Sequence, residues 1–359
     1  MSDIIQTPKK RIEYIDALRG FTMILVVFFH VSMLSFDSDS SFLNKLFLSF
    51  RMPLFFWVSG FIGYKANVSW DKHTWWTMSS KKVLVQLFPT LIFGLIYAYA
   101  YRHVGVKDFV MDNLKLGYWF TIVLLEIFLI IYTSNFLLYS KNSKVFKKRQ
   151  LVSIVILACL LYCFSFISKG IPALEEFCNI FSFHKLFKYF PFFAFGYICS
   201  MNKERFHGML ENNKYLVIVI IVLFCLLFYL NNYVIYPQYS VSIVFSSLYF
   251  LCRTIIGFLG LLIVYNTFRV YQDSFTADKK IGKALQYIGK RTLDIYLLHW
   301  FFFPVLPQLG NVLSEGKNMS LELLLGGGLS LIIVGICLVV SSVLRTSPIL
   351  GKYLFGAKK

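Results

Sequence analysis

Ionisable residues lie inside long apolar segments of this chain, and three of them besides Arg253 are the side chains that could carry acid–base chemistry. They are His30, Glu126 and His299. An ionisable group at membrane depth is costly, so its presence favours a functional role over a simple hydrogen bond between helices. A neutral imidazole can take a proton from a hydroxyl near neutral pH, and a carboxylate can orient such a ring. We therefore predict His30 as a general base, Glu126 as its orienting carboxylate and His299 as a competing base.

The composition predicts that membrane-spanning helices hold these residues. Hydrophobic residues make up 57% of the 359 residues and charged residues 15%, whereas soluble proteins carry about 25% charged residues. The fold class is therefore all-α, a polytopic membrane helical bundle with a single domain over residues 1–359. We expect the ninth span to kink or end early at Pro304 and Pro307. Because a span needs about 20 mostly apolar residues, the sequence predicts about ten transmembrane helices, at 16–36, 45–65, 83–102, 117–139, 151–168, 186–201, 214–231, 241–268, 290–310 and 321–344.

The distribution of Lys and Arg predicts the orientation of the bundle. With the N-terminus inside, 26 of the 36 Lys and Arg residues fall on the cytoplasmic side and 9 on the other. Positive residues are enriched on the cytoplasmic side, so the prediction is N-in and C-in. The net charge of +18 then follows from topology, and no nucleic-acid partner is expected. At 1.5 Å per residue, His30 lies about 16 Å deeper than Arg19.

This orientation is a testable prediction. A reporter fused after Lys148 should be cytoplasmic, and a reporter fused near Tyr236 should be on the opposite side, because the basic loops are expected inside. Paired alkaline phosphatase and fluorescent protein fusions in cells measure this. The reverse pattern would overturn the depths assigned above.

The sequence resembles acyltransferase family 3, the multi-span bacterial proteins that O-acylate cell-surface glycans and related acceptors. Four stretches carry the likeness: 11–20 (RIEYIDALRG) followed by His30, 51–61 (RMPLFFWVSGF), 117–120 (GYWF), and 285–289 (LQYIG) with 292–299 (TLDIYLLH). The resemblance implies an O-acyltransferase of the inner (cytoplasmic) membrane. It implies an acyl-CoA donor, acetyl-CoA being favoured, and a glycan or other hydroxyl acceptor, with membrane lipid around the protein.

One stretch departs from the family pattern. Many relatives have Arg-x-x-Arg before the proline that opens the third helix, and here residues 81–89 read KKVLVQLFP. Gln86 aligns with the second arginine. Lysine lacks the planar guanidinium with which arginine forms two parallel hydrogen bonds. We therefore expect this chain to bind the acyl-CoA donor through different contacts.

Basic residues near the predicted cytoplasmic helix ends are candidates for binding the acyl-CoA phosphates. The alternative for the lysines is that their charge only sets the orientation of the protein in the membrane and binds no donor. On the acceptor side, the candidates are Arg51, Lys185 and the aromatic run 118–120. The full set of candidate donor-binding residues is Arg19, Lys81, Lys82, Arg253 and Arg291.

Other patterns limit the chemistry. No HExxH, CxxC or pair of histidines at i and i+4 occurs, so no metal is expected. We interpret Ser59-Gly60 as close helix packing, with an acyl-serine as the alternative, and we expect Asp16 to pair with Arg19. Cys178 is placed in a loop. A transporter or exporter of polysaccharide units is the rival function, because buried charges can also line a permeation path.

Overall fold

The protein is described by a computed structural model that covers residues 12–37, 41–66, 68–168, 171–211, 213–238, 242–316 and 318–356. It is 86% helix, and no strand occurs among these residues. The all-α prediction is therefore confirmed. Seven residues that enter the charge count lie outside the described residues: Lys9, Lys10, Arg11, Lys169, Lys317, Lys358 and Lys359.

Seven helices in the described part of the chain are long and apolar enough to cross a membrane, and the chain is a multi-pass membrane protein. Each corresponds to one of the ten predicted spans. They are α1 (Glu13–His30, extended to Ser35 by a π-helical turn), α2 (Phe42–Gly63), the joined helices α3 (Lys72–Lys82) and α4 (Phe88–Ala100), α6 (Trp119–Leu138), α11 (Lys214–Tyr229, extended to Gln238), α12 (Ile243–Val270) and α16 (Met319–Leu344).

The other three predicted spans are not among these seven helices. The number of ten crossings therefore stays a prediction, and so does the orientation. The fifth and sixth correspond to α7 (Ser143–Ile167) and α9 (Phe183–Met201), and α9 carries two lysines near its start. The ninth is not one helix. It divides into α14 (Thr292–Leu298), a 3₁₀ turn at His299–Phe301 and α15 (Pro307–Gly316). This agrees with the expected early end, since proline lacks the N–H that a continuing helix needs.

Shorter helices complete the fold: α5 (Val106–Met111), α8 (Pro172–Ile180), α10 (Lys203–Glu211), α13 (Lys280–Lys290) and α17 (Pro348–Phe355). Cys178 is buried within α8, so its placement in a loop was wrong. The α8 segment was missed because its nine residues are too short to be read as a span. The third predicted span also begins too late, since helical structure continues back to Lys72.

Local sequence signals start several of these helices. Ser41, Asp71 and Asn142 each accept a hydrogen bond from a backbone N–H of the first turn of α2, α3 and α7. Asn213 and Asn318 do the same for α11 and α16. A side-chain acceptor at this position satisfies an N–H that the helix leaves free.

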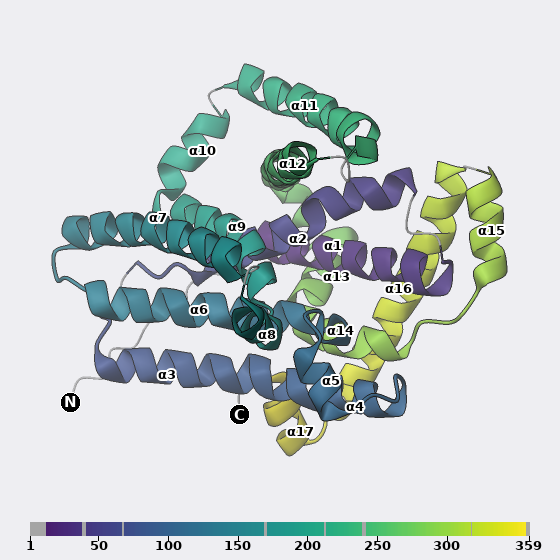
Figure 1. The fold of residues 1–359 in the computed structure, drawn as a ribbon, viewed down its shortest axis with the longest axis horizontal. Helices are drawn as coiled ribbons and strands as arrows, with labels where there is room; N and C mark the ends of the chain where they lie inside the picture. The colour runs from purple at the N-terminus through teal and green to yellow at the C-terminus, as the bar shows by residue number, and fades with distance from the viewer. Residues whose placement is uncertain are drawn as a thin grey trace.

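Glycines bring the central helices into contact. A Cβ on Gly60 of α2 would overlap the backbone carbonyl of Phe193 on α9, and a Cβ on Gly196 would overlap that of Trp57. Gly20 and Gly289 make the same approach between α1 and α13. The packing interpretation of Ser59-Gly60 is thus confirmed for the glycine. Figure 1 shows α1, α2 and α13 in the middle of the bundle, with α11 and α12 above and α3 and α4 below.

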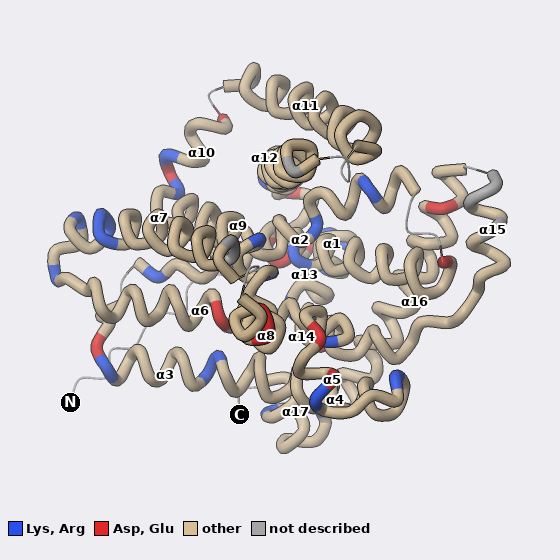
Figure 2. The backbone as a smooth tube through the Cα atoms, viewed as in Figure 1, with Lys and Arg blue, Asp and Glu red and all other residues tan. Residues whose placement is uncertain are grey.

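The charged residues are sparse in the ribbon and gather at particular places. Figure 2 shows Lys and Arg at the start of α7 and on α10, while much of the long helices carries neither sign. This is the distribution expected of helices whose middles lie in lipid.

Candidate active site

Two of the three predicted catalytic residues meet in the structure. His30 is the last residue of α1, and His299 begins the 3₁₀ turn that follows α14. His30 Nδ1 lies 3.2 Å from His299 Nε2. His299 is fully buried, whereas His30 is partly exposed. Of the two residues, His30 is the less buried.

The partners of His299 determine which nitrogen of each ring carries hydrogen. His299 Nδ1 lies 3.0 Å from the carbonyl oxygen of Ile295, which can only accept, so Nδ1–H donates to it. In the neutral ring, His299 Nε2 is then an acceptor for Nδ1–H of His30. This assignment leaves the lone pair of His30 on Nε2, the nitrogen turned away from His299.

Glu126 does not orient His30. Both of its carboxylate oxygens are buried, and neither has a hydrogen-bond partner among the described residues. The cation that acts on it is Lys115. The residues of this region that contact the histidine segment are 117–120, and Glu126 lies about 9 Å further along the α6 axis than Phe120. The predicted pairing of Glu126 with His30 was wrong because counting residues gives depth but not which helix faces meet.

Aromatic rings enclose the histidine pair. The Trp300 ring centroid lies 4.5 Å from that of His30 and 4.8 Å from that of His299. Phe303 packs on both rings. Gly117 has φ +105°, and a Cβ there would overlap the Trp300 indole. The glycine is thus needed both for its backbone conformation and for the close approach.

The segment before α6 is fastened to α14. The Tyr118 hydroxyl donates to the carbonyl of Leu297 at 2.9 Å, and the Tyr296 hydroxyl donates to that of Gly117 at 2.7 Å. Tyr118 is fully buried, so it does not present its ring to an acceptor as predicted. Its role is to position the histidine segment.

Lys115 holds the same segment from the other side. Its ammonium donates to the carbonyl oxygens of Val110, Asp112 and Asn179 at 2.6, 2.7 and 2.6 Å. All three of its donors are used. Burial lowers the pKa of Lys115 to about 8, and the charges of Asp112 and Glu126 act against this lowering.

A cavity of about 280 Å³ lies beside the half of α1 that carries Arg19, and neither histidine of the pair lines it. Arg19, Met23 and Val26 line it. With His30 they occupy positions i, i+4, i+7 and i+11, which place all four on one face of the helix. The cavity therefore follows this face of α1 from Arg19 to Val26, and His30 lies on the same face one helical turn further along.

Cations surround the far end of this cavity. Arg19 donates to Thr292 Oγ1 at 2.9 Å and lies 3.7 Å from Asp16, which confirms the predicted i, i+3 pair. Lys82 lines the cavity, as does Gln86 at the position where relatives have arginine. Two further cations, Lys290 and Arg345, also line it. They were not among the predicted donor-binding residues, although both belong to the charges expected on the cytoplasmic side.

The remaining predicted donor residues lie elsewhere. Lys81 is exposed and does not line the cavity. Arg291 donates to Ser341 and Ser342 and lies 4.0 Å from Asp294, a carboxylate that Arg345 binds with two hydrogen bonds of 2.9 Å.

Arg253 also lies outside this cavity. It is on α12, where it donates to the Tyr249 hydroxyl at 2.9 Å. Its charge acts on Arg51, Lys185 and Lys188. The structure therefore groups it with the residues predicted for the acceptor side.

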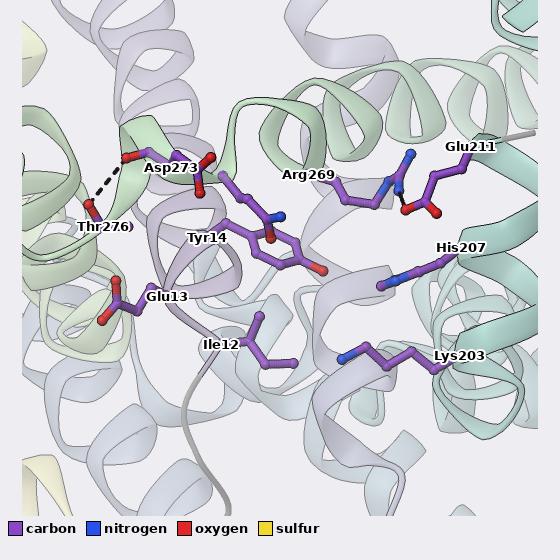
Figure 3. Close-up of a pocket in the computed structure, with 10 residues that line it drawn as sticks. Ile12, Glu13, Tyr14, Lys203, His207, Glu211, Arg269, Asp273 and Thr276 are labelled. Atoms are coloured by element: carbon purple, nitrogen blue, oxygen red, sulfur yellow. Dashed lines mark hydrogen bonds and ion pairs between the residues drawn. The ribbon is translucent and has the colours of Figure 1, made fainter.

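A second cavity, of about 540 Å³, lies between the start of α1, α10 and the end of α12. Figure 3 shows Lys203, His207 and Arg269 facing it together with Glu13, Glu211 and Asp273. Arg269 is ion-paired with Glu211. Burial, followed by the charges of Lys203 and Arg269, lowers the pKa of His207. Because its three acids outnumber Lys203 and Arg269, and because the histidine pair lies elsewhere, we do not assign the donor to this cavity.

Comparison with known proteins gives one match. A family model described as an acyltransferase domain, that of acyltransferase family 3, matches residues 12–343. No curated protein and no solved structure matches the chain. The matched region contains the histidine pair, most of the cavity beside Arg19 and the cations on α2, α9 and α12, whereas the cavity residues Arg345 and Phe355 lie beyond it.

Proposed function

Since the chain belongs to acyltransferase family 3 and is an acyltransferase, we propose that it transfers an acyl group from acyl-CoA to a hydroxyl of a cell-surface glycan or its precursor. Acetyl is the favoured acyl group, and the cytoplasmic membrane is the proposed location. The observation that carries the proposal is the single face of α1 that joins the cationic cavity at Arg19 to the base at His30.

The proposed reaction uses the lone pair on His30 Nε2. This nitrogen takes the proton of the acceptor hydroxyl while the hydroxyl oxygen attacks the thioester carbonyl carbon. Collapse of the tetrahedral intermediate breaks the carbon–sulfur bond, and the CoA sulfur receives the proton from His30. His299 stays neutral and accepts the hydrogen bond from His30 Nδ1, so that the ring is held in one orientation.

The cavity fits the two ends of an acyl-CoA. Positive charge for its phosphates comes from Arg19, Lys82, Lys290 and Arg345. Its acyl chain would contact the apolar residues that line the cavity, which are Met23, Val26, Met52 and Phe55. Gln86 replaces a cation of the relatives. In this chain Lys290 and Arg345 supply positive charge at the same opening.

The donor site gives a prediction. Arg19→Ala should weaken CoA binding by about tenfold to a hundredfold, because a hydrogen bond to a charged group contributes about 1.5–3 kcal/mol. Arg19→Lys should restore only part of the affinity, because lysine cannot bind a phosphate through two parallel N–H groups. Calorimetric titration of CoA into detergent-purified protein measures both. Lys283→Ala, which removes an exposed cation from α13, is the matched control. Equal affinities in all four proteins would exclude Arg19 from the donor site.

Acetyl-CoA turnover separates this function from the rival one. An acyltransferase should release free CoA slowly from acetyl-CoA even without an acceptor, because water can take the place of the hydroxyl. A transporter of polysaccharide units is not expected to hydrolyse the thioester of acetyl-CoA. Thiol release by purified protein, compared with His30→Gln, tests this. Release that is equal in the two proteins would remove the support for the proposed function.

A further inference from the structure

Four cations from three helices form a group beyond the histidine pair. They are Arg51 on α2, Lys185 and Lys188 on α9, and Arg253 on α12, here called the four-cation cluster. The charge of Arg253 acts on each of the other three, and that of Lys185 acts on Lys188. The helix α2 packs on both α9 and α12, and Phe192 of α9 contacts Phe258 of α12, so the three helices that carry these cations are neighbours.

Arg51 is the most buried member. Only 5% of its surface is exposed, and its Nε and Nη1 have no hydrogen-bond partner among the described residues. Its guanidinium carbon lies 3.7 Å from the ring centroid of Phe29. A buried guanidinium with free donors is costly to leave unpaired, so Arg51 is suited to receive a negatively charged group.

No acid neutralises the four-cation cluster within the described part of the chain. The ion pairs found there join Arg19, Arg269, Arg291 and Arg345 to carboxylates, and none involves a member of the cluster. Asp112 acts on Lys185 only at longer range. The second cavity provides the contrast, because its cations face three acids. Like charges held together in a low dielectric repel one another, so an anion would relieve that repulsion.

Stacked aromatic rings hold the two lysines in place. The Tyr189 ring stacks on Phe56 at 4.8 Å and on Trp119 at 5.3 Å between centroids. Lys185 lies over Trp119 at 5.6 Å, and Lys188 lies over Tyr189 at 5.4 Å. Such cation–π contacts hold an ammonium without neutralising its charge. Both lysines are only half-buried, so a ligand can reach them.

The four-cation cluster adjoins the base. Phe29, which packs on Arg51, is the residue next to His30, and the Arg51 charge acts on both His30 and His299. The donor cations line the cavity that begins at Arg19, 11 residues before His30 on the same helix. The donor cations therefore lie about 16 Å from His30 along α1, whereas the four-cation cluster adjoins the residue next to it.

We propose that the four-cation cluster binds an anionic group, a phosphate or a carboxylate, of the acceptor and so brings a neighbouring hydroxyl to His30 Nε2. The substrate class is therefore an acidic sugar or a sugar phosphate, and not a neutral glycan. This assignment rests on the proposed function, because it takes the ligand of the cluster to be the acceptor.

The test compares three probes on detergent-purified protein: glucose 1-phosphate, glucuronate and glucose. Binding is followed as the rise in melting temperature with probe concentration, with excess CoA present to occupy the cavity beside Arg19. One or both anionic sugars should bind, and glucose should not. Their relative affinities distinguish phosphate from carboxylate. Arg253→Gln and Lys188→Gln should each weaken binding of the anionic sugar about tenfold or more.

Two controls make the outcome decisive. Lys107→Gln removes an exposed cation from α5, outside the cluster, and should leave binding unchanged. Arg253→Lys keeps the charge and should retain most of the affinity. Equal binding of glucose and the anionic sugars, or an equal loss in Lys107→Gln, would overturn the inference. Acetyl-CoA turnover measured on the same samples separates the two proposals. Turnover without cluster-dependent anion binding refutes this inference alone, and anion binding without turnover refutes the proposed function.

Discussion

His30→Gln is expected to lower the rate of acyl transfer by about 10²–10⁴, the usual loss when a general base is removed, while acyl-CoA binding stays nearly unchanged. Glutamine can still donate a hydrogen bond to His299 Nε2, but it cannot shuttle a proton. The variant should therefore fold and yet be as inactive as His30→Ala. Single-turnover transfer from labelled acetyl-CoA, with the melting temperature measured on the same sample, gives both quantities.

Two further variants test the arrangement around this base. His299→Ala should lose activity by a smaller factor, because His30 Nε2 still carries a lone pair when the ring is less well held. Glu126→Gln should change activity least, since its oxygens make no hydrogen bond in the described structure. Substantial activity in His30→Gln would transfer the role of base to His299. A loss of activity that follows the loss of folded protein in every variant would instead indicate a structural role.

Gly196→Ala is expected to lower the stability of the protein strongly. Its Cβ would overlap the backbone carbonyl of Trp57 on α2, and a backbone carbonyl cannot move away as a flexible side chain can. Overpacking costs about 1–3 kcal/mol and sometimes more. We therefore expect a lower yield of folded protein and a clear fall in melting temperature in detergent.

Gly335→Ala on α16 is the matched control, because a Cβ there meets no atom within 4 Å. This variant should melt at least as high as the unchanged protein, since alanine favours helix more than glycine does. Equal melting of Gly196→Ala and Gly335→Ala would show that α2 and α9 are not held in close contact.

The sequence predicted where the long helices lie better than it predicted which of their polar residues meet. Hydrophobic runs located the spans, and polar residues within them marked His30 and His299. Residue counting placed Glu126 at a similar depth to His30, but the segment 117–120 contacts α14 and Glu126 does not reach the histidine. Counting residues gives only the depth of a side chain in the membrane. Whether two side chains form a hydrogen bond also depends on how their helices are rotated and tilted, and the sequence of one span does not show this.

The cations illustrate the same limit. Arg19 and Lys82 line the cavity as expected, while Lys290 and Arg345 line it from helices that are remote in sequence. Arg253 was grouped with the donor residues because it is basic and lies within a span. The structure groups it with Arg51 instead, because α12 packs on α2. Tertiary packing decides such neighbours, and the charge pattern along the chain does not contain that information.

The breaks in α1 and in the predicted ninth span have an evolutionary consequence. Regular α-helix ends at His30 on one side and gives way to a 3₁₀ turn at His299 on the other. Backbone groups freed at such breaks must be satisfied within the protein when no water is at hand. The N–H of Leu306 donates to the carbonyl of Ser35 at 2.8 Å. One irregular segment thus provides the donor and the other the acceptor of a single backbone hydrogen bond. Residues 31–35 and 302–306 should therefore covary among relatives, because a mutation that straightens one segment leaves its distant counterpart without a partner.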